Sequence, residues 1–306
     1  MSANYRHSVK AVREEFKNNG VFYTPPELAE MMKSFLPQDI DEIYDPTCGN
    51  GNLLSAFGDD VKKYGQDIDY EQIEQARKRL VNFTGISGDT LKEPAFRGRK
   101  FKNIIANPPF SIKWDGKLDE RFEAAPCLPP NSKADYAFIL HCLYYLSEDG
   151  TAVIMNFPGI LYRGQREGKI RQWLLEQNYI DSVIHIPPNK FEDTSIATCI
   201  LILKKHRNTT DVFFINQEID KTRKVKYKEI VDNGYNLSVS LYVAEEEKKE
   251  IIDPIKLEHE AQQKLVHRLR TELEFSKFVC NEEGINFAAL LEELGKVINE
   301  FMEGIK

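Results

Sequence analysis

Polar residues follow short apolar segments at regular intervals through the first third of the chain. The segment Ile40–Tyr44 leads to Asp45, and a second apolar segment leads to Asp67. A third turn carries Asp89. The segments have the length of buried strands, and the intervals leave room for a helix between them. This alternation predicts an α/β fold with a parallel sheet, in which ligands bind at the carboxyl ends of the strands.

The first of these turns, residues 45–52, is rich in small residues and has glycines at positions 49 and 51. A strand, a glycine turn and a helix open a nucleotide-binding βαβ unit, where small residues let a cofactor approach the backbone. The three-glycine spacing of dinucleotide-binding proteins is missing. Asp67 is suited to accept both hydroxyls of a ribose, and Asp89 to receive an adenine amino proton. For each carboxylate taken singly, a solvated surface residue is the alternative interpretation.

A fourth apolar segment, Phe101–Ala106, ends in the tetrapeptide Asn107-Pro108-Pro109-Phe110. Prolines cannot continue a sheet ladder, so the tetrapeptide is expected at the carboxyl end of a strand. An Asn side-chain oxygen and a backbone carbonyl fixed by proline offer two acceptors to one amino group, and the aromatic ring can stack on a flat ring. The site is therefore suited to hold the exocyclic amine of a base. The alternative is an ordinary strand-ending turn, since Asn and Pro are common in turns.

A helix is expected to begin within the segment Gly20–Pro26. Thr24 is placed to cap this helix and Pro25 suits its first turn, and apolar residues at positions 28, 31, 32, 35 and 36 keep helical spacing. Phe22 and Tyr23, which precede the helix, are equally suited to wall a ligand pocket.

Taken in order, residues 22–25, 45–51, 65–67, 88–89 and 107–110 resemble the S-adenosylmethionine-dependent DNA methyltransferases that act on adenine N6. Within that family, the chain resembles the modification subunit of type I restriction-modification systems. The similarity continues through residues 134–138, 153–164 and 184–201, and it covers residues 18–243. The combination is specific, whereas the Asn-Pro-Pro element alone also occurs in glutamine and RNA methyltransferases. The implied fold is a Rossmann-like methyltransferase sheet with helices on both faces, followed by a helical tail.

The resemblance implies roles for individual residues. Positions that match the S-adenosylmethionine site are Val21, Phe22, Tyr23, Thr24, Pro25, Pro26, Asp45, Thr47, Cys48, Gly49, Asn50, Gly51, Asn52, Asp67, Asp89 and Asn107. The catalytic positions are Asn107, Pro108, Pro109 and Phe110, and Phe110 and Phe191 would stack on an adenine extruded from double-stranded DNA. The amine nitrogen would attack the sulfonium methyl group in line, without a metal ion, a general base or a nucleophilic cysteine.

The chain of 306 residues is long enough for one large domain and an appendage. We expect a helical extension at residues 1–19, a catalytic domain at 20–243 and an amphipathic helical tail at 244–306. The tail repeats apolar residues at helical spacing and predicts two helices. Such a stripe indicates burial without identifying the partner. The tail helices are expected to pack against the catalytic domain or each other, or to bind a specificity subunit or a second copy of the chain.

Charge is distributed unevenly along the chain. The net charge is −7, and residues 244–306 contribute most of it, with 15 acidic and 9 basic side chains. Basic clusters at residues 163–171 and 221–228 are candidates to meet DNA phosphates, although solvated surface charge is the commoner explanation. His141, on an apolar helix, is expected to be packed rather than catalytic.

Several classes of protein are disfavoured by the sequence. There is no apolar run of 18 residues and no signal peptide pattern, so a cytoplasmic protein with no membrane association is expected. Five cysteines without regular spacing predict neither a zinc site nor a disulfide framework. The alternatives to a DNA methyltransferase are an RNA or protein-glutamine N-methyltransferase and a non-catalytic adaptor that keeps the fold. The adaptor would require loss of groups such as Asp67, Asp89 or Asn107, which are all present.

Overall fold

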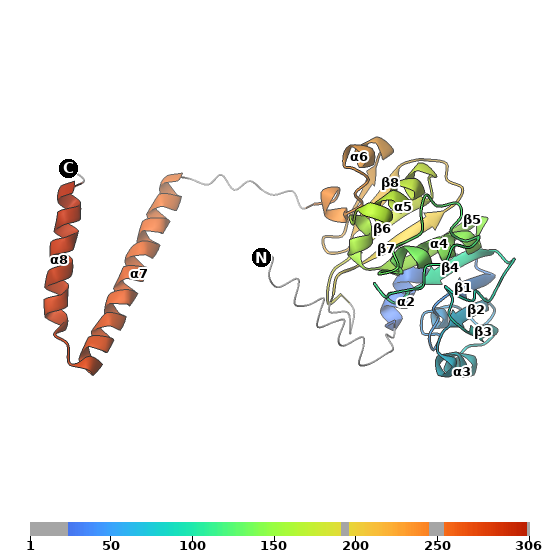
Figure 1. Ribbon diagram of the computed structural model, residues 1–306, viewed down its shortest axis with the longest axis horizontal. Coiled ribbons are helices and arrows are strands. Elements are labelled where there is room, and N and C mark those ends of the chain that lie inside the picture. The colour runs from blue at the N-terminus through green and yellow to red at the C-terminus, as the bar shows by residue number, and fades with distance from the viewer. Residues whose placement is uncertain (1–23, 191–195, 245–253, 305–306) are drawn as a thin grey trace. The chain divides into compact units, whose positions relative to one another are not determined.

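The computed structural model describes residues 24–190, 196–244 and 254–304 (Figure 1). The chain divides into two compact units, residues 1–245 and 246–306. The expected helix at residues 1–19 lies outside the described residues, as do the site candidates Val21, Phe22, Tyr23 and Phe191.

A nine-stranded sheet forms the centre of the first unit (Figure 1). Its strands are β1 Glu42–Asp45, β2 Lys62–Asp67, β3 Phe83–Ser87, β4 Phe101–Ala106, β5 Leu146–Asn156, β6 Ile180–Ile186, β7 Thr198–Lys204, β8 Val212–Asn216 and β9 Lys221–Val225. The order across the sheet is β3-β2-β1-β4-β5-β7-β6-β8-β9. Strands β7 and β9 run antiparallel to their neighbours, and the other strand pairs are parallel.

Helices cover both faces of this sheet. On one face, helices α2 (Pro26–Lys33) and α3 (Tyr70–Arg79) bury Leu28, Met32 and Ile73 against the strands. On the other face, helices α4 (Asp135–Tyr145), α5 (Gln165–Glu176) and α6 (Tyr227–Asp232) contribute to a second core cluster. Short 3₁₀ helices lie at Leu54–Ala56, Pro158–Leu161 and Val239–Leu241. The predicted α/β sheet with helices on both faces is confirmed.

The strand ends lie where the sequence placed them. Strand β4 has the predicted bounds, because its apolar run stops at two prolines. Strands β1 and β2 end at Asp45 and Asp67 themselves. Since β1 pairs in parallel with both β2 and β4, the carboxyl ends of the three strands meet at one edge of the sheet. That edge carries two carboxylates and the Asn-Pro-Pro-Phe tetrapeptide side by side.

The prediction that Thr24 caps the following helix is wrong. Pro25 occupies the position before helix α2, and no side chain caps the first turn. The hydroxyl of Thr24 accepts a hydrogen bond from the Asn107 side-chain Nδ2 at 3.2 Å instead. A contact across 83 positions of sequence has therefore replaced a local one.

Two arginines considered for phosphate contacts bind partners within the first unit: Arg171 is buried and Arg163 is partly exposed. The guanidinium of Arg171 donates to the backbone oxygens of Ile160, Arg163 and Tyr235. Arg163 pairs with Asp135 and Glu167. Arg171 therefore has an internal structural role and is neither a phosphate contact nor solvated surface charge, whereas a phosphate contact of Arg163 stays a prediction.

The second unit contains helices α7 (Pro254–Glu283) and α8 (Phe287–Gly304), so the two predicted tail helices are confirmed. Large apolar side chains on both helices are exposed, among them Leu265, Phe278, Val297 and Phe301. Within the residues that the structure describes, no helix is both long enough and apolar enough to span a membrane.

Candidate active site

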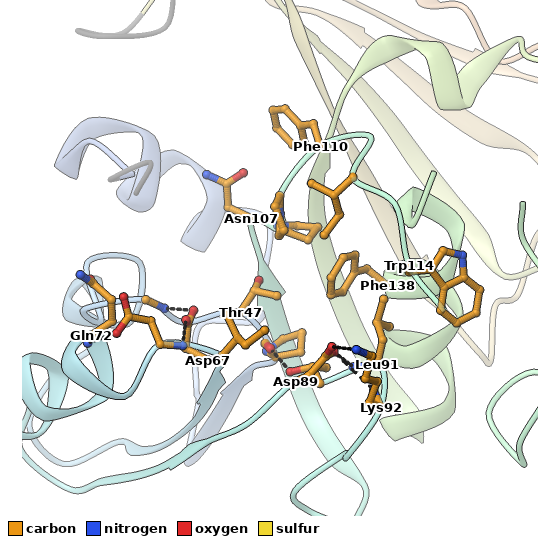
Figure 2. Close-up of a pocket in the computed structure, with 18 of the residues that line it drawn as sticks. Thr47, Asp67, Gln72, Asp89, Leu91, Lys92, Asn107, Phe110, Trp114 and Phe138 are labelled. Carbon is orange, nitrogen blue, oxygen red and sulfur yellow. Dashed lines mark hydrogen bonds and ion pairs between the residues drawn. The ribbon is translucent and has the colours of Figure 1, made fainter. Parts of the chain in front are cut away.

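A cavity of about 680 Å³ lies at the carboxyl edge of β1, β2 and β4 (Figure 2). This volume falls in the range of small-molecule binding sites, roughly 300–1,000 Å³. The lining residues come from the turn after β1, the end of β2 and the turn after it, helix α3, the 89–92 loop, the tetrapeptide after β4, the segment 112–115 and helix α4. The polar strand ends therefore open on one shared space.

The glycine turn after β1 exposes its backbone, without side chains at the glycines, to this cavity. Gly49 has a φ of +50° and its N–H donates to Asp67 Oδ2 at 2.8 Å. A Cβ at Gly49 would meet nothing within 4 Å, so the backbone here borders open space. Gly51 has a φ of +82°, and a Cβ there would lie 2.5 Å from Leu80 Cδ1. Both positions therefore favour glycine, Gly49 for its backbone angle and Gly51 also for its close packing.

Asp67 ends β2 with its carboxylate at the cavity (Figure 2). Its Oδ2 accepts from the Gly49 N–H, and its Oδ1 accepts from the Asp69 N–H at 3.0 Å. Burial raises the pKa of this carboxyl above its usual value, and the two backbone donors oppose that shift. A carboxylate has about four acceptor positions, so each oxygen keeps one for a ligand.

Asp45 has a different environment from Asp67. It is 1% exposed, and its Oδ1 accepts from the N–H of Thr47 at 2.9 Å. Burial raises the pKa of Asp45 to about 8. Asp45 therefore stabilises the turn after β1 without lining the cavity, whereas Thr47, which it contacts, lines the cavity.

The loop that carries Asp89 is tied to both neighbouring strands. Asp89 Oδ1 accepts from the backbone of Leu91 at 3.0 Å and of Lys92 at 3.3 Å. The buried amide of Gln66 donates to the backbone oxygen of Gly88 at 3.2 Å. Thr90 donates to the backbone oxygen of Pro46 at 2.5 Å. These contacts hold the Asp89 carboxylate at the cavity wall.

Asn107 lies at the end of β4 with its amide held from one side (Figure 2). Its Nδ2 donates to Thr24 Oγ1 at 3.2 Å. Because an amide is planar, fixing the nitrogen on Thr24 directs the side-chain oxygen to the opposite side. The arrangement leaves Asn107 able to accept a hydrogen bond from a ligand.

Aromatic residues and an ordered loop form the rest of the wall. Phe110, Trp114 and Phe138 line the cavity (Figure 2). The Trp114 indole N–H donates to the backbone oxygen of Pro130 at 3.1 Å, and the Trp114 backbone N–H donates to that of Asn131 at 3.0 Å. The long loop between β4 and α4 is thus folded back on itself beside the site.

Arg121 connects this loop to the 89–92 loop in the wall of the cavity. Its side chain is 1% exposed, pairs with Asp119 and donates to the backbone oxygens of Thr90 and Leu91 at 2.7 and 2.6 Å. Arg121 also contacts His141 Nδ1 at 3.0 Å. Since arginine only donates, this nitrogen is the acceptor, and burial together with Arg121 lowers the His141 pKa. His141 is packed and neutral, which confirms the prediction that it is structural.

The structure brings together only part of the predicted site. The predicted residues that line the cavity are Thr47, Gly49, Asp67, Asp89, Asn107, Pro108, Pro109 and Phe110. The described candidates that do not line it are Thr24, Pro25, Pro26, Asp45, Cys48, Asn50, Gly51 and Asn52. Several of these shape the turn or hold a lining residue, as the contacts of Asp45, Gly51 and Thr24 show.

Sequence reasoning missed other lining residues, including Ile68, Gln72, Lys92, Ile112 and Phe138. Ile68 is 71% exposed, and an apolar residue between the strand-end Asp67 and the helix-capping Asp69 was a usable signal. The side-chain oxygen of Gln72 is buried without a partner in the described part of the chain, a property that no local pattern reveals.

Comparison with known proteins points to one family. The N-6 DNA Methylase family matches residues 5–224 of the chain. The type I restriction enzyme MpnII methylase subunit of Mycoplasma pneumoniae is 34% identical, with 79% of this chain and 56% of the relative covered. The MjaIX methylase subunit of Methanocaldococcus jannaschii is 28% identical, with 81% and 47% covered.

A solved structure shares the fold. The type I restriction-modification methyltransferase subunit from Streptococcus thermophilus is 33% identical, with a TM-score of 0.67 over 72% of this chain and 59% of that one. The likeness confirms the expected methyltransferase sheet. The chain spans about half the length of the curated relatives it matches.

Proposed function

Because the chain belongs to the N-6 DNA Methylase family, we propose that it transfers a methyl group from S-adenosylmethionine to the N6 amino group of adenine in DNA. One observation carries the proposal: the tetrapeptide 107–110 and the strand-end carboxylates Asp67 and Asp89 open on the same cavity. Groups suited to an amine and groups suited to a nucleoside therefore face each other.

The residues of the β1–β2 side fit the nucleoside part of this cofactor. The Asp67 carboxylate keeps acceptor positions for the ribose hydroxyls, and Asp89 lies at the adjoining wall for the adenine amine. Gly49 borders open space where a side chain would stand, and the unpartnered oxygen of Gln72 lies at the same wall. When bound, S-adenosylmethionine supplies an electrophilic methyl group on a positively charged sulfur.

The residues after β4 hold the amine that receives the methyl group. The Asn107 oxygen and the Pro108 carbonyl accept the two amine protons, so that the nitrogen lone pair points toward the methyl donor. The surplus proton leaves the amine after transfer and passes to solvent, so the proposal assigns no general base. Catalysis then rests on positioning, which can contribute several kcal/mol.

Adenine in a duplex must leave the base stack to reach this site. Extrusion costs roughly a few kcal/mol, and stacking on an aromatic side chain returns about 1–3 kcal/mol. Phe110 at the cavity provides one stacking ring. Phe191, outside the described residues, is proposed as a second contact.

We also propose that helices α7 and α8 bind another protein chain. Their exposed apolar residues lie along both helices, and the relatives are named as subunits of type I restriction enzymes. A DNA-reading specificity subunit fits this role, because the described residues provide no separate DNA-reading domain.

The test is transfer of labelled methyl groups to unmethylated bacterial DNA, using the full chain together with the proteins that co-purify with it. RNA and protein from the same cells serve as parallel substrates. The expected result is label in DNA, recovered as N6-methyladenine after digestion to nucleosides.

Other outcomes contradict the proposal in different ways. Label in RNA or in glutamine residues would identify the chemistry as correct and the substrate as wrong. Failure to bind S-adenosylmethionine would favour an adaptor that keeps the fold without the activity.

A further inference from the structure

The backbone immediately after the tetrapeptide is held in an unusual conformation. Ser111 has a φ of +53°, in the left-handed region that side chains other than glycine rarely adopt. Such a conformation persists only where the surroundings impose it. Ser111 separates Phe110 from Ile112, and both neighbours line the cavity. What fixes Ser111 therefore also fixes the direction in which Phe110 leaves the backbone.

The side chain that fixes Ser111 is Asp135, the first residue of helix α4. Asp135 Oδ1 accepts from the Ser111 backbone N–H at 2.7 Å, and its Oδ2 accepts from the Ser111 hydroxyl at 3.3 Å. One residue earlier on the same side, the N–H of Ala134 donates to the backbone oxygen of Ile112 at 2.8 Å. Two adjacent residues of the turn are thus tied to the start of α4.

Arg163 holds the Asp135 carboxylate in turn. Its Nη1 lies 3.2 Å from Asp135 Oδ2 and 3.0 Å from Glu167 Oε1. The Asp135 side chain is 1% exposed, and that of Arg163 is 16% exposed. Removing one partner of a buried ion pair leaves the other charge without compensation. The position of the Asp135 carboxylate is therefore strongly determined.

We propose that Asp135 is a positioning residue: with Arg163 behind it, its carboxylate fixes Ser111 and keeps Phe110 oriented for stacking on the extruded base. The inference rests on the proposed function and gives Asp135 and Arg163, from the segments 134–138 and 153–164, a role that the proposed function does not assign. Asp135 itself contacts neither the base nor the cofactor in this account.

The first test compares Asp135→Asn with a matched control, Asp181→Asn. Asparagine keeps the shape of the side chain and removes its charge. Asp181 forms a comparable pair with the buried Arg207 at 3.2 Å, near the start of β6 and away from the carboxyl edge of the sheet. Single-turnover methyl transfer is measured at a temperature where circular dichroism shows both variants folded.

The expected result is a rate loss of about 10-fold or more for Asp135→Asn, because small misplacements at a reacting centre cost up to roughly 10²-fold. Binding of S-adenosylmethionine should stay near the wild-type value in both variants, and Asp181→Asn should keep the wild-type rate. Transfer by Asp135→Asn at the wild-type rate would overturn the inference.

A second test separates positioning from a loss of general stability. Asp135→Asn is combined with Phe110→Ala, which removes the ring on which Asp135 is proposed to act. In the Phe110→Ala background, the Asp135 substitution should change the rate by less than about 2-fold, since contacts in one network are not additive. An equal fractional loss in both backgrounds would mean a merely structural role and would overturn the inference.

Ser111→Pro tests the same contact if Asp135→Asn does not fold. Proline removes the N–H that Asp135 accepts and excludes a positive φ. It should reproduce the rate loss and the non-additivity with Phe110→Ala, and a wild-type rate would overturn the inference. If the wild-type protein transfers no methyl group in any of these assays, the proposed function fails and this inference fails with it.

Discussion

The two sides, or halves, of the cavity differ in whether their buried carboxylates have a cationic partner. On the β1–β2 side, Asp45 and Asp67 form no ion pair among the described residues, and burial raises the pKa of both. On the β4–α4 side, Asp135 is buried and paired with Arg163. In the first half, burial therefore favours the neutral form of the carboxyls, and no cation among the described residues offsets it. The second half pairs its buried carboxylate with a cation and lines the cavity with a neutral amide and aromatic rings.

The largest effect should come from Asn107, which belongs to the second half. Asn107→Ala removes an acceptor of the target amine and should lower the methyl-transfer rate by about 10²–10³-fold, the cost of losing one positioned polar group at a reacting centre. Cofactor affinity should change little. The measurement is single-turnover transfer beside equilibrium binding of S-adenosylmethionine.

A matched control for Asn107 is Asn103→Ala on the same strand. Asn103 is buried and donates to the backbone oxygen of Glu42 at 3.2 Å, away from the cavity. This control should lose stability and keep the transfer rate. A comparable rate loss in both variants would contradict a specific role for Asn107.

The raised pKa of Asp45 in the first half predicts a pH dependence of stability. The pKa of Asp45 is raised to about 8 in the folded protein. The stability that its protonated form contributes is therefore fully present below the unfolded pKa near 3.8 and is lost as the pH rises through 8. As the pH rises from 4 to 8, the free energy of unfolding of Asp45→Asn should therefore increase relative to that of the wild type, by up to about 1.4 kcal/mol per pH unit. Urea unfolding of both proteins across this range measures the difference, and parallel curves would contradict it.

Asp67 should control cofactor affinity rather than the chemical step. Asp67→Asn removes the charged acceptor for the ribose and should weaken S-adenosylmethionine binding by about 10–100-fold, since hydrogen bonds to charged groups contribute about 1.5–3 kcal/mol. Titration calorimetry checks this. Asp149→Asn, at an exposed position of β5, is the control and should bind as the wild type does. Unchanged affinity in Asp67→Asn would remove Asp67 from the cofactor site.

The smallest effect should come from Thr24, which links the two halves. Thr24→Val keeps the size of this buried side chain and removes the hydroxyl that accepts from Asn107, so kcat should fall by about 5–10-fold, the value of one hydrogen bond. KM for S-adenosylmethionine should stay constant, and Thr24→Ser should restore kcat. A raised KM with normal kcat would instead place Thr24 in the cofactor site, as the sequence first suggested.

Local patterns predicted the strands and their polar ends because those signals are carried by neighbouring residues. The bounds of β4 follow from an apolar run and two prolines, and Asp67 follows directly from its strand. The two tail helices follow from their apolar spacing in the same way. Each of these features is decided within a few positions of the chain.

The contacts that hold the site in place were not predictable in this way. Thr24 meets Asn107 across 83 positions, and Arg163 meets Asp135 across 28. Arg163 and Arg171 looked like surface charge because sequence spacing does not reveal a buried acceptor on another element. Likewise, no local signal places β7 between β5 and β6. Tertiary packing decided these features after the local structure was set.

The most direct test of the division between the two halves is the amount of N6-methyladenine formed as the S-adenosylmethionine concentration is raised, compared between Asp67→Asn and Asn107→Ala. The account predicts that saturating cofactor restores Asp67→Asn to near the wild-type rate and leaves Asn107→Ala about 10²–10³-fold slower than the wild type. Recovery of Asn107→Ala, or failure of Asp67→Asn to recover, would contradict it.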